Sequence, residues 1–342
     1  MKSNYLKICR GAIKRVEETL EINQISGKIL YVADSYVDKL YGDVVKEQIE
    51  RIGRLKVEFA DYNTISYAMD IAERCIATDV DCIVGLGGGR VLDVCKYAAY
   101  VSKTPYLAIP TTAANDGLTS PIAVLKRKDG LPKSLGAAMP AMVLIDTEVI
   151  ALGPVQNIKA GIGDTISNYM ALKDWEFAVS RGKDEMNTYA YLMSRNSLDA
   201  LMKTSYDKIC PEFIEVLVNS LVLSGIAMDF AGTSRPVSGS EHCFSHALDY
   251  YNEKQNLHGI QVALGTVAML KLIDEPYKEV LAYLKKFEVD INPVHLSISE
   301  KTFVECMQKG SSMRKGRYTY LDEANLGEIN LKRLYKELEE EL

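Results

Sequence analysis

The sequence predicts a two-domain protein: an α/β domain with a parallel sheet over residues 1–152, followed by an all-helical domain over residues 153–342. Three observations lead to this prediction. Short apolar runs alternate with amphipathic helical patterns in the first half of the chain. The apolar runs stop near Gly153 and Pro154, where long helical patterns take over. A chain of 342 residues with 47% hydrophobic residues is also long enough that one core usually divides into two.

The N-terminal half begins with a polar stretch that we expect to be helical, and the alternation follows it. Apolar runs with helical patterns between them predict a parallel sheet with helices on both faces. The expected order is strand 28–34, helix 41–53, strand 55–61, helix 64–78, strand 81–89, helix 90–103 and strand 105–112. We expect 126–136 to form a hairpin or flap over the sheet edge and 142–150 to form the last strand.

The C-terminal half contains long helical patterns instead. The expected helices are 159–182, 185–203, 211–232, 241–252 and 259–273. No uninterrupted apolar run approaches the length that spans a bilayer, so we expect 211–232 to be a buried helix and the protein to have no membrane span. The charged end, 332–342, is expected to be a solvated helix.

Composition narrows the class of protein. The net charge is −6 and the basic residues are scattered, so nothing favours nucleic acid or an anionic membrane as a partner. Any anionic ligand therefore needs a local site. The seven cysteines are widely spaced without a CxxC pair, which is typical of reduced thiols, and the N-terminus has no leader pattern. We expect a cytoplasmic protein.

A glycine-rich turn, VGLGGGRVLDVCK (84–96), stands where a buried strand should end and a helix should begin. Backbone N–H groups in such a turn can approach a phosphate, and the helix N-terminus adds partial positive charge. Gly87, Gly88 and Gly89 in succession exceed what a tight turn alone needs. The turn departs from the GxGxxG fingerprint, because Arg90 stands at its last position. We interpret it as a phosphate-binding turn, with a ligand-free tight turn as the alternative.

Asp34 ends the first expected strand. An acid at this point could bind a ribose 2′-hydroxyl, which would favour NAD over NADP. A helix N-cap is an equally good interpretation of the same residue.

The loop IPTTAANDGLTSP (109–121) follows the next strand along the chain. Ligands of parallel sheets bind outside the carboxyl ends of the strands, so this loop and the glycine turn could line one site. Hydroxyls of Thr111, Thr112 and Ser120 could contact a phosphate or a nicotinamide. Asp116 could take a substrate hydroxyl, although an ordinary Asn-Asp-Gly turn explains it as well.

Three of the four histidines lie within residues 238–259. His242 and His246 share one helix face if this stretch is helical, and His258 follows a polar loop. A catalytic zinc or iron site needs three protein ligands and an open position. Asp164, within a small and apolar stretch, is the carboxylate candidate, because it would be costly to bury without a cation. Cys243 competes weakly, because it points about 100 degrees around the helix from His242.

Two other interpretations of the histidines carry less weight. They could be unrelated core or surface residues, but histidine is otherwise nearly absent from the chain. A Ser-His-Asp hydrolase is set aside, because the chain has no GxSxG elbow.

Taken in order, five segments resemble signatures of the sn-glycerol-1-phosphate dehydrogenase family: GGGRVLDVCK, PTTAANDGLTSP, GIGDTISNYMALKDW, SRPVSGSEHCFSHALD and LHGIQVALGT. That family is part of the dehydroquinate synthase-like superfamily, with the iron-containing alcohol dehydrogenases, glycerol dehydrogenase and dehydroquinate synthase. The resemblance runs from about residue 28 to GRYTYL at 316–321. It implies a dehydroquinate synthase-like architecture, with a nucleotide-binding α/β domain, a helical domain and a metal in the cleft between them.

The resemblance also implies residue roles. Asp164, His242 and His258 would hold one zinc or iron ion, while His246 and Asp116 would contact the substrate. The implied contacts to NAD or NADP are Gly89, Arg90, Val91, Asp93, Thr111, Thr112, Ala113, Ala114 and Ser120. A homo-oligomer is expected by analogy with relatives.

The implied reaction is reversible hydride transfer between NAD(P)H and the C2 carbonyl of dihydroxyacetone phosphate, which gives sn-glycerol 1-phosphate. A glycerol or polyol dehydrogenase is the first alternative, because no basic residue in the motifs is uniquely a phosphate clamp; Arg235 is a candidate but could simply order a turn. A lyase like dehydroquinate synthase is less well supported, because Glu241 and Asp249 depart from that enzyme's pattern. A nucleotide-binding regulatory protein without turnover is a further alternative. The stretch TTAAND also lacks the family's usual histidine beside Asp116, which leaves the substrate open.

Overall fold

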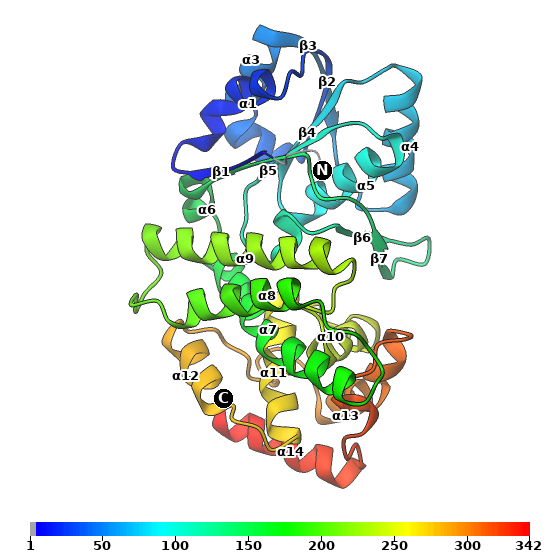
Figure 1. Cartoon of the computed structure of the whole chain (residues 1–342), viewed down its shortest axis with the longest axis vertical. Coiled ribbons are helices and arrows are strands. Elements are labelled where there is room, and N and C mark those ends of the chain that lie inside the picture. Colours follow the sequence, from blue (N-terminus) through cyan, green and yellow to red (C-terminus); the bar gives the residue numbers. More distant parts are fainter. Residues whose placement is uncertain (1–4) are drawn as a thin grey trace. The chain divides into compact units, whose positions relative to one another are not determined.

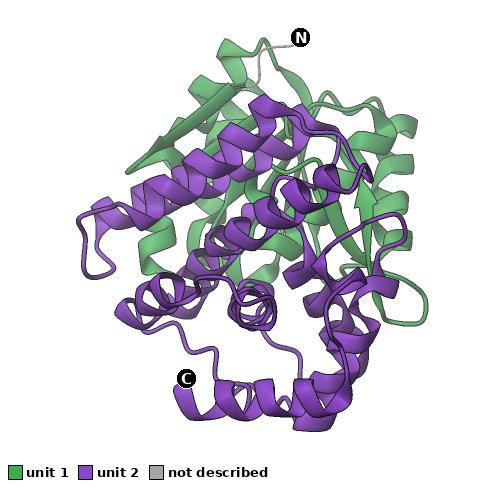
Figure 2. Cartoon of the chain, turned by 60° about the horizontal axis from the view of Figure 1, so that its bottom comes forward, with its two compact units in different colours: residues 1–113, 117–154 green, residues 114–116, 155–342 purple. Residues whose placement is uncertain are grey.

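The computed structural model describes residues 5–342, which form two compact units (Figure 2). The first unit contains the described residues up to Ala113 together with Gly117–Pro154. The second contains Ala114–Asp116 and Val155–Leu342. The chain therefore leaves the α/β unit for three residues in the middle of the 109–121 loop before it returns.

A parallel sheet of six strands, in the order β1-β8-β5-β4-β2-β3, forms the centre of the first unit (Figure 1). The strands are β1 (Tyr5–Cys9), β2 (Gly27–Ala33), β3 (Gly53–Phe59), β4 (Cys82–Gly87), β5 (Tyr106–Pro110) and β8 (Met142–Asp146). Every residue of β4 and β5 is buried, as expected for central parallel strands covered on both faces. The predicted parallel α/β sheet is confirmed.

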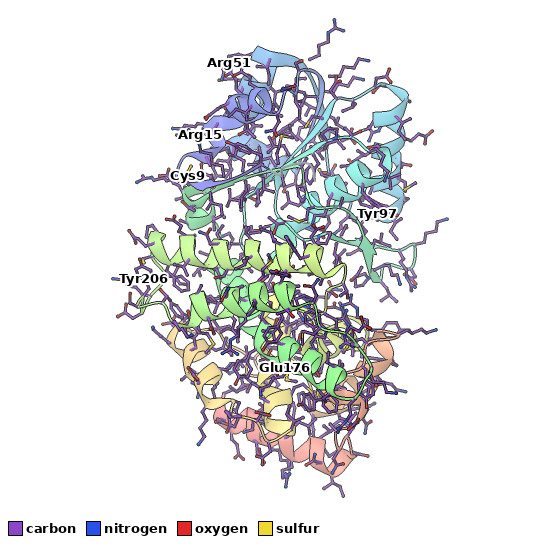
Figure 3. The ribbon with its side chains drawn as sticks, viewed as in Figure 1. Cys9, Arg15, Arg51, Tyr97, Glu176 and Tyr206 are labelled. Atoms are coloured by element: carbon purple, nitrogen blue, oxygen red, sulfur yellow. The ribbon has the colours of Figure 1, made fainter. Side chains whose placement is uncertain are left out.

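Helices cover both faces of this sheet. They are η1 (Ala12–Arg15), α1 (Val16–Ile22), α2 (Ser35–Val37), η2 (Asp38–Gly42), α3 (Asp43–Ile52), α4 (Ile65–Ala77), α5 (Gly89–Ser102) and α6 (Thr147–Leu152). The core beneath α1 and α3 takes alternate strand residues such as Ile29 and Tyr31, because successive strand side chains point to opposite faces. Arg51, labelled in Figure 3, lies in the last turn of α3 and forms an ion pair of 2.7 Å with Glu17 of α1.

Two parts of the first unit differ from the prediction. The expected N-terminal helix is present as α1, but the strand before it was missed; β1 is an edge strand of mixed exposure that pairs with β8 from Tyr5↔Met142 onward. The last strand ends at Asp146 rather than at residue 150, because the Asp146 carboxylate accepts from Glu148 N (3.0 Å) and caps α6. The predicted hairpin is confirmed as β6 (Ile122–Lys126) and β7 (Pro132–Gly136).

The second unit is helical in its described part. Its elements are α7 (Val155–Ser180), α8 (Thr188–Met202), α9 (Pro211–Ala231), α10 (Ser240–Tyr251), α11 (His258–Leu272), α12 (Lys278–Lys286), α13 (Glu300–Lys309), η4 (Gly310–Met313), η5 (Tyr320–Asp322) and α14 (Glu328–Glu341). The long helix α7 packs against α8, α9, α10 and α11. The five predicted helices are present, whereas α14 is not simply solvated: Leu331, Leu334 and Leu338 are buried.

α9 is long and apolar enough to cross a membrane by length and composition alone. However, 61% of its most apolar window is buried inside the protein. This burial is typical of a core helix, so α9 is weak evidence for a membrane span.

α7 and α11 approach each other closely at a pair of glycines. A Cβ at Gly163 would lie 2.3 Å from Gly259 O, and a Cβ at Gly259 would lie 1.9 Å from Ala160 O. Neither position has room for a side chain. Because Asp164 follows Gly163 and His258 precedes Gly259, this contact brings the two side chains toward each other.

Candidate metal and nucleotide sites

Asp164, His242 and His258 gather within the second unit, from α7, α10 and α11 respectively. One ligand atom of each lies within 4.8 Å of the others, and Nε2 of His258 is 3.8 Å from Oδ1 of Asp164. Bonds of about 2.0–2.2 Å place the ligand atoms around a zinc ion roughly 3–4 Å apart. Two imidazoles and a carboxylate at this spacing fit one divalent cation after a small adjustment.

The first turn of α10 is anchored to α7. The carboxylate of Asp174 accepts from both the backbone N–H and the hydroxyl of Ser240, each at 2.6 Å. Its other oxygen accepts from Tyr320 N at 2.7 Å. This buried carboxylate fixes the start of α10 and therefore the position of His242, two residues later.

Each metal-ligand candidate among the histidines is oriented through Nδ1. In His242 this atom is 2.7 Å from Oε1 of Glu241, and in His258 it is 3.1 Å from the Ser245 hydroxyl. The Ser245 hydroxyl donates to Gln261 Oε1 (2.6 Å), so it accepts from Nδ1–H of His258. A proton on Nδ1 leaves Nε2 as the free lone pair, which is the usual arrangement of metal-binding histidines.

Burial sets the protonation states of these groups. It lowers the pKa of His242 and of His258 to about 3, so both imidazoles are neutral at neutral pH, as metal ligands must be. Burial, followed by the nearby charge of Asp116, raises the pKa of Asp164 well above its usual value. Within residues 5–342 no lysine or arginine forms an ion pair with Asp164, so a bound cation would stabilise its ionised form.

Asp116 lies beside this cluster. Its backbone N–H donates to Oδ2 of Asp164 at 2.9 Å, which leaves Oδ1 facing His258. Asp116 is one of the three residues that the 109–121 loop contributes to the second unit. The loop therefore helps to orient a ligand candidate through its backbone.

His246 and Cys243 lie near the cluster but outside it. The His246 ring centroid is 6.4 Å from that of His242 and 6.3 Å from that of His258, whereas the latter two are 4.9 Å apart. Burial lowers the pKa of His246 well below its usual value, so this imidazole is neutral and can accept or donate a hydrogen bond. Cys243 is buried, and burial raises the pKa of its thiol to about 12.

The glycine turn lies between β4 and α5 in the first unit. A Cβ at Gly87 would lie 2.8 Å from Val91 side-chain atoms, so the fold itself requires this glycine. A Cβ at Gly88 would meet only the side chain of Thr112, with Oγ1 at 3.4 Å and Cγ2 at 3.8 Å, and one at Gly89 would meet nothing within 4 Å. Packing therefore accounts for Gly87 but leaves space beside Gly89, where α5 begins and no side chain of its N-cap residue bonds the backbone N–H groups.

The other nucleotide-site candidates in the first unit have mixed surroundings. Asp34 accepts from Tyr36 N (3.0 Å) and Val37 N (2.9 Å), so it caps α2, and a ribose contact stays a prediction. Ser120 is buried and lies 3.4 Å from Lys96 Nζ. The remaining candidates differ in exposure: Arg90 is exposed, Val91, Thr111 and Ala113 are buried, and Asp93 and Thr112 are partly buried, as is Ala114 in the second unit.

Known proteins resemble this chain over most of its length. A family model described as iron-containing alcohol dehydrogenase matches residues 7–154. The chain is 33% identical over 315 residues to glycerol-1-phosphate dehydrogenase (NAD(P)+) of Methanosarcina mazei, which covers 91% of this chain and 88% of that protein. The enzyme of the same name from Hyperthermus butylicus is 32% identical over 321 residues, covering 92% and 91%. The chain belongs to the glycerol-1-phosphate dehydrogenase family.

Solved structures share the fold of this glycerol-1-phosphate dehydrogenase family member. Glycerol dehydrogenase from Schizosaccharomyces pombe aligns with a TM-score of 0.81 at 20% identity, covering 98% of this chain and 89% of that one. Maleylacetate reductase from Agrobacterium tumefaciens aligns with a TM-score of 0.75 at 14% identity, covering 99% and 97%. These identities support the fold alone. The predicted fold class and the resemblance drawn from the motifs are both confirmed.

Two basic residues of this family member escaped the sequence reasoning. Arg314 and Arg317 lie near α10, where both form hydrogen bonds to Ser238. The stretch SSMRKGR (311–317) carries a detectable signal, because serines and basic residues surround a glycine. Arg235, the candidate named from the sequence, is instead engaged with Asp184 and with Tyr318 O.

Proposed function

We propose that this protein is a metal-dependent, NAD(P)-linked oxidoreductase that interconverts dihydroxyacetone phosphate and sn-glycerol 1-phosphate. One observation carries the proposal: Asp164, His242 and His258 converge within 4.8 Å in a chain that is 33% identical to a glycerol-1-phosphate dehydrogenase. The fold alone does not identify this activity, because proteins with the same fold act on different substrates.

The residues present fit one zinc or iron ion held by Asp164, His242 and His258. When bound, such an ion supplies a Lewis acid that polarises a carbonyl oxygen, and NAD(P)H supplies the hydride. Glu241 holds the Nδ1 proton of His242, and Ser245 does the same for His258, so both Nε2 atoms stay available. Asp116 fixes Oδ2 of Asp164 through its backbone.

His246 is proposed to contact the substrate. Its neutral imidazole lies beside both histidine ligand candidates without joining them. A neutral imidazole can donate a hydrogen bond to one substrate hydroxyl or pass on its proton. Asp116 is proposed as a second substrate contact.

The cofactor is proposed to place its diphosphate on the glycine turn. Gly88 and Gly89 leave backbone N–H groups at the start of α5 without covering side chains. The further cofactor contacts that we propose lie in this turn and in the 109–121 loop: Arg90, Val91, Asp93, Thr111, Thr112, Ala113, Ala114 and Ser120. Whether NAD or NADP is preferred depends on the ribose contact, for which Asp34 remains the candidate.

Oligomeric state and location belong to the same proposal. We expect a homo-oligomer in the cytoplasm that acts on a small molecule, by analogy with metabolic relatives. Light scattering on the purified chain checks the first point, because a monomer would have a mass of 38.0 kDa.

Turnover by the purified, metal-loaded protein tests the function. The oxidation of NADH and NADPH is followed with dihydroxyacetone phosphate and with dihydroxyacetone. In the reverse direction, the reduction of NAD+ and NADP+ is followed with glycerol. We expect turnover with the phosphorylated ketone. Turnover with the unphosphorylated substrates alone would make the protein a polyol dehydrogenase and refute the proposal. No turnover with any of them would favour a lyase or a regulatory role.

A further inference from the structure

Three arginines converge on the segment between α9 and α10. Arg317 donates to Ser238 O and, at 2.8 Å, to the Ser234 hydroxyl. Arg314 donates to the Ser238 hydroxyl at 2.9 Å. Arg235 lies in the same segment and donates to Tyr318 O at 2.7 Å. Residues 234–238 and 314–318 are thus tied together, with three guanidinium groups in a small volume.

The positive charge of this cluster is poorly neutralised. In the described part of the chain neither Arg314 nor Arg317 forms an ion pair with a carboxylate. Arg317 is nevertheless buried, with only 9% of its surface exposed. Only Arg235 has such a partner, Asp184. Buried arginines are almost always paired, because desolvating a guanidinium is costly. Arg317 shows this cost, since burial and the charges of Arg314 and Arg235 lower its pKa to about 9.

The neighbouring carboxylate does not complete the cluster. Glu241 attracts both arginines through its charge, but its Oε1 accepts from Gly239 N and is 2.7 Å from the His242 ring. No ion pair joins it to Arg314 or Arg317 among residues 5–342. The two arginines therefore retain an excess of positive charge that an anion would balance.

Arg314 is the arginine with free donors. It is only partly buried, and its one hydrogen bond to the described residues leaves Nε and Nη2 available. An edge of a guanidinium with two parallel donors matches two oxygens of a phosphate. Arg317, whose Nη1 and Nη2 donate to Ser238 and Ser234, holds the segment and adds charge.

The cluster also lies close to the proposed reaction site. Ser238, to which both Arg314 and Arg317 donate, directly precedes Gly239 and the start of α10, the helix that carries His242 and His246. In dihydroxyacetone phosphate only a methylene group and an ester oxygen separate the carbonyl from the phosphorus. A phosphate site for this substrate must therefore lie beside the carbonyl site.

We infer that Arg314 binds the phosphate group of the substrate, with Arg317 as the positioning residue behind it, so that this pair selects the phosphorylated ketone over the free one. This inference rests on the proposed function and assigns its substrate specificity. Arg235 is excluded from direct contact, because its remaining nitrogen, Nη2, is completely buried.

Substitution of Arg314 tests the inference. We expect Arg314→Ala to lower kcat/KM for dihydroxyacetone phosphate by about 10- to 100-fold, the range for a lost charge-assisted contact, and to leave kcat/KM for dihydroxyacetone unchanged. Arg314→Lys should recover part of the loss, because it keeps the charge but not the fork. Arg333→Ala, at an exposed arginine of α14, is the matched control and should behave as wild type.

A binding measurement separates failure of this inference from failure of the proposed function. Inorganic phosphate is titrated by calorimetry into metal-loaded wild type, Arg314→Ala and Arg333→Ala. Phosphate binding that Arg314→Ala alone abolishes would support the anion site even if wild type turned over no phosphorylated substrate. Equal phosphate binding by all three proteins, or equal losses of kcat/KM with both ketones, would overturn the assignment.

Discussion

Single side chains decide the chemistry of this protein, and His242 is one of the three proposed ligands of the metal. His242→Ala should remove about one bound zinc or iron ion per chain, because it leaves only two of the three protein ligands. Elemental analysis of the purified proteins measures this. His295→Ala is the matched control, since His295 is exposed and paired with Asp290 at 2.9 Å outside the cluster. Equal metal content in wild type and His242→Ala would refute the ligand assignment.

The burial of Asp93 makes the stability of the protein depend on pH. Burial raises its pKa from 3.8 to about 6, against the attraction of Lys96, so the folded state holds this proton more tightly than the unfolded chain does. Ionisation of Asp93 therefore costs stability as the pH rises from about 4 to about 6. Below this window the carboxyl is protonated in both states, and the cost vanishes.

Asp93→Asn removes this cost because an amide does not ionise. The unfolding free energy of the variant relative to wild type should rise by about 2 kcal/mol between pH 4 and pH 7. Denaturant titrations at a series of pH values measure the difference. Asp70→Asn, at an exposed position of α4, should show no such trend. A relative stability of Asp93→Asn that falls or stays constant with pH would contradict the expectation.

At the scale of elements, the contact between α7 and α11 decides whether the site forms. Gly259→Ala would place a Cβ 1.9 Å from Ala160 O, so the helices must separate. We expect a loss of about 3 kcal/mol in unfolding free energy, near the upper end for overpacked contacts, together with weaker metal binding, because His258 moves away from Asp164. Chemical denaturation and a metal titration measure the two effects.

A variant in the glycine turn, Gly89→Ala, is the control for Gly259→Ala. Gly89→Ala adds a Cβ that meets nothing within 4 Å, so its stability should change by less than about 0.5 kcal/mol. It should instead weaken NAD(P) binding, because the new methyl group occupies the space beside the turn. If both glycine variants lost the same stability, close packing of α7 and α11 would not be the cause.

At the scale of the whole molecule, metal binding should be linked to folding. A ligand that binds only the native state at 100 times its Kd stabilises that state by about 2.7 kcal/mol. We therefore expect a chelator to lower the Tm of wild type and zinc to restore it, measured by calorimetry. His242→Ala should show neither change. A Tm of wild type that is indifferent to chelator would argue against a structural contribution from the metal.

Much of the fold could be predicted from local sequence patterns. Alternation of apolar runs with helical patterns predicted the parallel sheet, and long periodic stretches predicted α7 to α11. The edge strand β1 was missed because YLKIC is half-exposed and short, so it lacks the continuous apolar run of a central strand. Its place beside β8 depends on a partner more than 130 residues later in the chain.

By itself, the sequence determined which chemistry is available: a glycine turn for phosphate, a His-x-x-x-His pair on one helix face, and an acid in an apolar stretch. Residue type and local spacing encode such properties directly. Only the tertiary structure decided which groups meet. The glycine contact that brings Asp164 toward His258 and the approach of Arg314 to Ser238 join residues far apart in the chain. Long-range contacts of this kind leave no periodic signal in the sequence.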